Sequence, residues 1–121
     1  MKLFMVEIRV SDATRARDWY VQSLGLTVRM EDPAGGFVLL EGGGVGLALK
    51  AGEAHVAGRD AVRLAFEVED VEAERARLVS RSVEIGEVAE NTAEGYREVR
   101  LLDLDGTPIT LFSSIRPGGS L

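Results

Sequence analysis

The stretch FEVEDVEAERARL, residues 66–78, joins the pattern of a strand to the pattern of a helix through one aspartate. Up to position 69 apolar residues alternate with acidic ones, which is the period of a strand with one buried face. Asp70 supplies an oxygen that can accept from the first free amides of a helix. The pairs Glu72–Arg75 and Glu74–Arg77 then fall on one side of that helix. The stretch therefore predicts a strand, a cap and a helix, in that order.

The same order occurs 58 residues earlier, where IRVSD (8–12) aligns with FEVED (66–70). Residues 2–10 alternate like a strand, and Ser11 and Asp12 supply cap chemistry for a helix over 13–24, which Gly25 ends in a left-handed conformation. Strands are predicted at 26–31, 36–41 and 45–50 in the first half, and at 83–88, 96–103 and 108–113 in the second. The chain thus reads β-α-β-β-β twice.

We therefore predict a single α+β domain made of two βαβββ modules, residues 1–52 and 60–115. Residues 51–60 are predicted to link them, and residues 116–121 to form a flexible tail. In each module apolar residues of one parity are expected to face the helix. This set comprises Phe4, Val6, Ile8, Leu47, Leu49, Leu64, Phe66, Val68, Val99, Leu101, Ile109 and Leu111.

The composition limits the classes of function. The chain has 121 residues, of which 45% are hydrophobic and 28% charged, as in a globular domain. Its formal charge of −6 disfavours nucleic acid as a partner, since phosphate binding needs basic patches. There is no cysteine, which excludes disulfides and thiolate metal sites. The first residues do not form a signal peptide, and no apolar run approaches the length of a membrane span. We expect a cytoplasmic protein without a membrane partner.

Three motifs resemble the vicinal oxygen chelate superfamily, also called the glyoxalase/bleomycin-resistance/dioxygenase family. They are RVSD…ARDWYVQSLGL (9–26), FEVEDVEAERARL (66–78) and DLDGTPITLFS (103–113), and together they span nearly the whole chain in the expected order. The resemblance implies two curved mixed sheets with helices on their outer faces and a cavity on the concave side. It also implies a homodimer, which is common among family members of this length.

The acidic sequence DLDG (103–106) raises the question of a metal loop. A calcium loop has glycine at its sixth position and an acid at its twelfth, whereas counting from Asp103 places Gly106 fourth and Ser114 twelfth. Asp-Gly between alternating hydrophobic residues instead predicts a hairpin turn. We interpret both aspartates as structural.

Metal-dependent members of this family place ligands on the first and fourth strand of each half, and the resemblance maps those positions onto Met5, Ala48, Arg63 and Thr110. Divalent metals require imidazole nitrogen or carboxylate oxygen, so these four residue types do not form a metal site. The guanidinium of Arg63 would also repel a cation. We predict no metal and no other cofactor. The only histidine, His55, falls in the predicted linker, where a solvated role is expected.

The polar parity of the strands predicts the face that lines the cavity. Charged and aromatic residues are mixed on it, and three functions remain open: binding of a small organic molecule, a metal-independent lyase or isomerase with Glu7 or Glu67 as base beside Arg63, or a metal-dependent enzyme with displaced ligands. A wet sheet face with no ligand is equally compatible with the pattern. The predicted ligand-binding residues are Met5, Glu7, Arg9, Phe37, Ala48, Lys50, Arg63, Glu67, Tyr96, Arg100, Thr110 and Phe112; Leu39, Ala65 and Glu98 share their parity.

Overall fold

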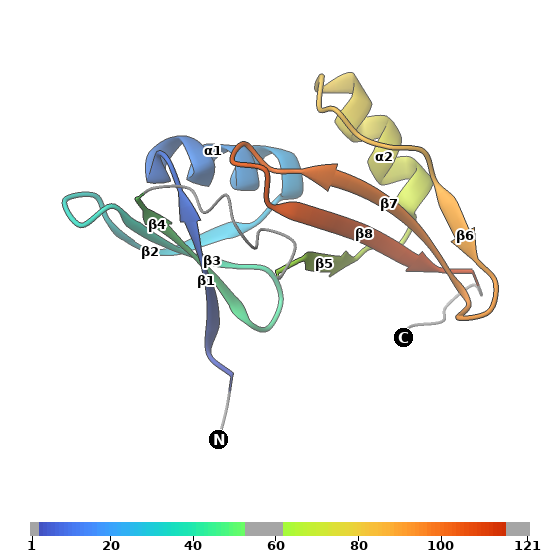
Figure 1. The fold of residues 1–121 in the computed structure, drawn as a ribbon, viewed down its shortest axis with the longest axis horizontal. Helices are drawn as coiled ribbons and strands as arrows, with labels where there is room; N and C mark the ends of the chain where they lie inside the picture. The colour runs from blue at the N-terminus through green and yellow to red at the C-terminus, as the bar shows by residue number, and fades with distance from the viewer. Residues whose placement is uncertain (1–2, 53–61, 116–121) are drawn as a thin grey trace. The chain divides into compact units, whose positions relative to one another are not determined.

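The computed structural model describes residues 3–52 and 62–115 (Figure 1). The chain divides into two compact units, Met1–Ala57 and Gly58–Leu121. Most of the predicted linker, including His55, and the whole predicted tail lie outside the described residues. Each unit is one four-stranded mixed sheet with one helix, so the predicted α+β fold of two similar βαβββ halves is confirmed.

The first unit contains β1 (Met5–Val10), α1 (Ala13–Leu24), β2 (Thr27–Asp32), β3 (Phe37–Glu41) and β4 (Gly46–Ala51). Its strand order is β1-β4-β3-β2, with β1 parallel to β4 and the other neighbours antiparallel. The helix α1 packs against β2, β3 and β4 and covers one face of this sheet (Figure 1). The opposite face carries no helix of this unit, and we call it the helix-free face of the first sheet.

Local sequence determines both ends of α1. The Asp12 carboxylate accepts a hydrogen bond from the amide of Arg15 at 3.0 Å, which satisfies one of the free donors of the first turn. Gly25 ends the helix with φ of 72°, a conformation that costs glycine little because it has no Cβ. Between these ends Ala16 and Tyr20 are almost fully buried, and they make the apolar side that packs on the sheet.

The second unit contains β5 (Leu64–Glu67), α2 (Val71–Ser80), β6 (Ala89–Asn91), β7 (Tyr96–Leu102) and β8 (Pro108–Ser114). Its strand order is β5-β8-β7-β6, with β5 parallel to β8. The helix α2 packs against β7 and β8 (Figure 1). The opposite face is the helix-free face of the second sheet.

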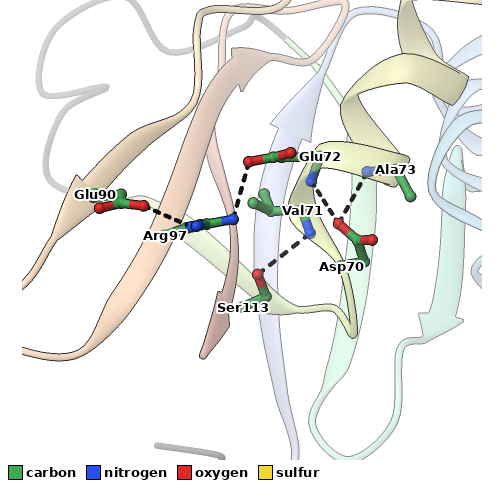
Figure 2. A network of polar contacts seen from close by, with 7 residues as sticks. All are labelled: Asp70, Val71, Glu72, Ala73, Glu90, Arg97 and Ser113. Atoms are coloured by element: carbon green, nitrogen blue, oxygen red, sulfur yellow. Dashed lines mark hydrogen bonds and ion pairs between the residues drawn. The ribbon is translucent and has the colours of Figure 1, made fainter. Parts of the chain in front are cut away.

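Polar contacts attach α2 to its sheet (Figure 2). The Asp70 carboxylate accepts from the amides of Glu72 and Ala73 at 3.0 and 3.1 Å, and the amide of Val71 donates to the hydroxyl of Ser113 on β8 at 3.3 Å. Arg97 on β7 bridges two acids, with 3.0 Å to Glu72 on the helix and 2.9 Å to Glu90 on β6. The first turn of α2 is thereby held to β8 and β7 from its sheet-facing side.

The two sheets repeat the same register. In the first, Glu7 on β1 is the direct partner of Ala48 on β4; in the second, Ala65 on β5 is the direct partner of Thr110 on β8. The first strands correspond at a separation of 58 residues and the last strands at 62, so the paired positions of β5 and β8 have equivalents in β1 and β4. The duplication inferred from IRVSD and FEVED therefore extends to the strand that closes each module.

Two local predictions, on residues 83–88 and on Phe4, are wrong. Residues 83–88 form no strand: they contribute a single bridge from Ile85 to Leu101, the carbonyl of Gly86 accepts from the Arg75 side chain at 2.7 Å, and β6 begins only at Ala89. Phe4 does not join the apolar core; it precedes β1 and is 55% exposed, with the Arg29 guanidinium 5.9 Å from its ring.

The predicted helix pairs are also only half correct. Glu74 and Arg77 form the expected ion pair at 2.8 Å. Arg75 instead pairs with Glu87 beyond the helix, and Glu72 pairs with Arg97 on β7. Partners outside the helix, Glu87 before β6 and Arg97 on β7, therefore replace the helical partner that the spacing predicted for these two residues.

Within residues 3–52 and 62–115, neither helix has the length and apolar character that crossing a membrane requires.

Candidate functional site

The strand registers place each predicted site residue on a face. On the first sheet Met5, Glu7, Arg9, Phe37, Leu39, Ala48 and Lys50 share the helix-free face. On the second, Ala65, Glu67, Tyr96, Glu98, Arg100, Thr110 and Phe112 share it, while Arg63 precedes β5. The alternation of polar and apolar residues thus predicted correctly that these strand residues share a face within their sheet. They form one group in each unit. The two groups are described separately below.

The DLDG sequence is a hydrogen-bonded turn between β7 and β8. The buried Asp103 carboxylate accepts from the amides of Asp105 and Thr107, each at 2.8 Å, and the Asp103 amide donates to the Thr107 carbonyl. Gly106 adopts a positive φ of 84°. The Asp103 carboxylate thus accepts from two amides of its own turn, as the structural interpretation of this residue predicts.

The first pair of positions at which family members hold a metal is apolar here. Met5 lies two residues before Glu7, the direct partner of Ala48, so Met5 and Ala48 are diagonal neighbours on one face. Ala48 has no exposed surface, and Leu39 beside it is 5% exposed. A Cβ built on Gly46 would meet Leu39 Cδ1 at 2.9 Å and Met5 Cβ at 3.4 Å, so Leu39 and Met5 close over that glycine.

The second pair is equally unsuited. Thr110 is buried between its partners Ala65 and Arg100, both of which are exposed. Arg63 lies two residues before Ala65, in the place equivalent to Met5, and it is exposed. A hydroxyl and a guanidinium give neither the imidazole nor the carboxylate that a divalent metal needs, and the guanidinium adds a repelling charge.

The chemistry of these four side chains therefore does not fit the metal of metal-dependent relatives. Displaced ligands have no support either: in the part of the chain that the structure describes, no three His, Cys, Asp or Glu side chains come together in a way that could hold an ion. No step of a reaction is derived through a metal for this protein.

An aromatic pair occupies the helix-free face of the second sheet. The rings of Tyr96 on β7 and Phe112 on β8 meet edge to face, with centroids 6.2 Å apart. The amide nitrogen of Asn91 on β6 donates to the Tyr96 hydroxyl at 3.2 Å and fixes the position of that ring. Both rings are half-buried, so each presents part of its apolar surface to solvent. This is the clearest apolar feature of that face that a flat molecule could contact.

Asn91 was not among the predicted site residues. Its side-chain oxygen accepts from the amide of Glu94 at 3.0 Å, which is the ordinary role of an asparagine at the start of a turn. The sequence gives that signal in NTAEG (91–95) but no indication that the amide nitrogen contacts a tyrosine five residues later. The short pairing of β6 with β7 makes Asn91 the direct partner of Tyr96.

The two glutamates predicted as general bases are both exposed. Glu7 is exposed and forms no ion pair within residues 3–52 or 62–115. Glu67 is exposed on the edge strand β5, where its direct partner is Phe112. In the described residues no printed ion pair joins Glu7 to Arg63, so the arrangement of a base beside an arginine stays a prediction.

One pKa shift on the surface has a clear cause. Arg17 on α1 donates to Asp18 and to Glu31 on β2, and these hydrogen bonds raise its pKa above the ordinary value. Arginine is charged at neutral pH in the folded and the unfolded chain alike, so this pair gives stability no pH dependence in that range. Its contribution is to connect α1 with the edge strand of the first sheet.

Comparison with known proteins agrees with this geometry. The sequence profile of the Glyoxalase/Bleomycin resistance protein/Dioxygenase superfamily matches residues 2–111. The chain belongs to this superfamily. No curated protein sequence matches the chain significantly.

Solved structures share the fold at low sequence identity. SMU.1112c is 27% identical with a TM-score of 0.76, covering 93% of this chain and 98% of its own. TnmS3, described as an antibiotic binding protein from Streptomyces sp. CB03234, is 25% identical with a TM-score of 0.79, covering 94% and 96%. A glyoxalase/bleomycin resistance protein/dioxygenase from Nocardioides is 22% identical with a TM-score of 0.76, covering 100% and 89%; at that identity the likeness concerns the fold alone.

Proposed function

We propose that this protein binds a small, flat organic molecule on the helix-free side of its sheets and does so without a metal. The observation that carries the proposal is the Tyr96–Phe112 ring pair, which stands on the solvent side of the second sheet and is steadied by Asn91. Aromatic rings that are rigid and partly exposed provide contact area at a small cost in side-chain entropy. The likeness at 25% identity to TnmS3, described as an antibiotic binding protein, supports a binding role.

Absence of the metal is part of the same proposal. It rests on the side chains of Met5, Ala48, Arg63 and Thr110, which offer a thioether, a methyl group, a guanidinium and a hydroxyl. A protein that binds rather than transforms its ligand needs no Lewis acid. The homodimer implied by the resemblance and the cytoplasmic location expected from the composition belong to the proposal as well, and sedimentation equilibrium tests the former.

A neutral aromatic probe tests the binding face. We expect 1-naphthamide to shift the backbone NMR signals of Tyr96 and Phe112, and cyclohexanecarboxamide to shift them much less. Phe112→Leu should weaken the binding of 1-naphthamide by about tenfold, because an aromatic contact is replaced by an aliphatic one.

The matched control is Phe66→Leu, which removes a ring of the same sheet from the helix-covered face. This variant should lower the free energy of unfolding and leave the affinity for 1-naphthamide unchanged. Equal affinities in wild type and Phe112→Leu would contradict the proposed site.

A further inference from the structure

Two cations stand side by side on the helix-free face of the first sheet. Arg9 on β1 is the direct partner of Lys50 on β4, and Lys50 is in turn the direct partner of Phe37 on β3. The three side chains thus form one row across neighbouring strands. Like charges placed directly opposite each other destabilise a sheet, so this pairing opposes the stability of the fold.

No acid within residues 3–52 or 62–115 forms an ion pair with either of these two cations. Arg9 makes no hydrogen bond or ion pair with any residue in the described ranges, and Lys50 donates only to the backbone carbonyl of Gly35, at 2.6 Å. Glu7, one row away on the same face, is not within ion-pair distance of either cation. Asp32, at the far end of the row, accepts from the amide of Gly35 at 3.1 Å.

Both cationic groups extend toward the same end of the sheet. A Cβ built on Gly52 would lie 3.1 Å from Nη1 of Arg9, so the guanidinium passes over this glycine just beyond β4. The Lys50 ammonium reaches Gly35, in the turn that precedes β3. Each group keeps further N–H donors after these contacts, and donors from two cations on paired strands can bind the oxygens of one acidic group.

Phe37 completes the row and is half-buried. We propose that Arg9 and Lys50 bind the acidic group of an organic ligand, a carboxylate, sulfonate or phosphate, whose apolar body lies on Phe37. The unpaired cations carry this inference. It goes beyond the proposed function, because it concerns the first unit and does not depend on the Tyr96–Phe112 site.

The second sheet shows that the repeat does not require such a row. At the equivalent positions β5, β8 and β7 carry Glu67, Phe112 and Glu98. Here two acids flank an aromatic ring, and Glu98 forms an ion pair with Arg100 at 3.3 Å. The same register thus holds opposite charge in the two halves, and the preference for an anion belongs to the first unit alone.

Isosteric probes separate charge from aromatic character. 1-Naphthoate and 1-naphthamide have the same ring system and differ in the charge of the substituent. We expect 1-naphthoate to bind with a Kd about tenfold lower, to shift the NMR signals of Arg9, Lys50 and Phe37, and to lose that advantage at high salt. Inorganic phosphate should shift the Arg9 and Lys50 signals and leave those of Phe37 nearly unchanged.

Substitutions of Arg9 and Lys50 test whether these two residues cause the preference for 1-naphthoate. Arg9→Met and Lys50→Met should each abolish the preference for 1-naphthoate over 1-naphthamide, whereas Lys50→Arg should retain it. The matched control is Arg15→Met, which removes an exposed cation from α1 that forms no ion pair in the described part of the chain. Circular dichroism of each variant verifies that the fold persists, and Lys50→Arg tests the site even if Lys50→Met fails to fold.

The result that overturns the inference is equal binding of the two probes, including no binding of either at millimolar concentration. A preference for 1-naphthoate that survives in both Arg9→Met and Lys50→Met also overturns it. Loss of 1-naphthamide binding at Tyr96 and Phe112 would leave the result for this row unaffected, so failure of the proposed function and failure of this inference are distinguishable.

Discussion

The carboxylate of Asp103 accepts a hydrogen bond from the amide of Thr107 at 2.8 Å, across the turn that joins β7 to β8. A second bond from the Asp105 amide to the same oxygen closes the turn from within. Because the side chain is buried, these amides would have no equivalent partner in its absence.

Asp103→Ala should therefore lower the free energy of unfolding by about 1–3 kcal/mol, since it leaves two turn amides without their acceptor. Asp103→Asn keeps one carbonyl oxygen and should lose less. Urea denaturation followed by circular dichroism measures both. Glu84→Ala, which removes an exposed acid, is the control and should be nearly neutral; an equal loss in Glu84→Ala would contradict the explanation.

The two helix caps provide a comparison within one chain. Asp70 accepts from two amides of α2, whereas Asp12 accepts from one amide of α1. We expect Asp70→Ala to cost about 1–2 kcal/mol and Asp12→Ala about 0.5–1 kcal/mol in the free energy of unfolding. Chemical denaturation of the two variants gives the order directly, and the reverse order would show that hydrogen-bond number does not govern these caps.

Gly36 combines a positive φ with a close approach. Its φ is 64°, and an added Cβ would lie 2.7 Å from the Cβ of Ala51. Gly25 has a similar φ of 72° with open space around it. Gly25→Ala should therefore cost about 1–2 kcal/mol for the backbone conformation alone. Gly36→Ala should cost more, because β3 and β4 must separate. Thermal unfolding compares them, and equal losses would exclude a steric contribution at Gly36.

Metal content tests the coordination argument. We expect protein purified without chelators to contain far less than one transition metal ion per chain by elemental mass spectrometry. EDTA should leave the Tm unchanged, because no bound ion contributes to stability. A stoichiometric metal that is lost in Thr110→Val, which removes only the hydroxyl, would show that these positions coordinate after all.

The sequence predicted most of this fold because its strongest signals are local. The limits of α1 follow from Asp12 and Gly25, whose cap chemistry acts within one turn. The strand predicted over 83–88 is absent, and Gly86 in this segment accepts from the side chain of Arg75, a contact that no local pattern contains. Phe4 was misassigned for a related reason: alternation gives the face of a residue but not where the strand begins.

The sequence predicted on which face of a sheet the candidate site residues lie, but not which of them contact each other. The alternation of side chains along the strands predicted that Tyr96 and Phe112 share one face, and in the structure their rings are in contact. The adjacency of Arg9 and Lys50 required the register between β1 and β4, which is established only when residues about 40 positions apart pair. Asn91 escaped prediction because its contact with Tyr96 depends on the short strand β6, which sequence reasoning placed elsewhere.

The burial of β4 has a consequence for the integrity of the first unit. Gly46, Leu47, Ala48 and Leu49 are all buried, so the first four residues of this strand are apolar on both faces, and β1 alone covers one of its two hydrogen-bonding edges. If β1 were removed by proteolysis or truncation, β4 would become an exposed apolar edge strand. Such a strand can form backbone hydrogen bonds with a strand of another chain. The six residues of β1 thus protect the edge of β4 against aggregation.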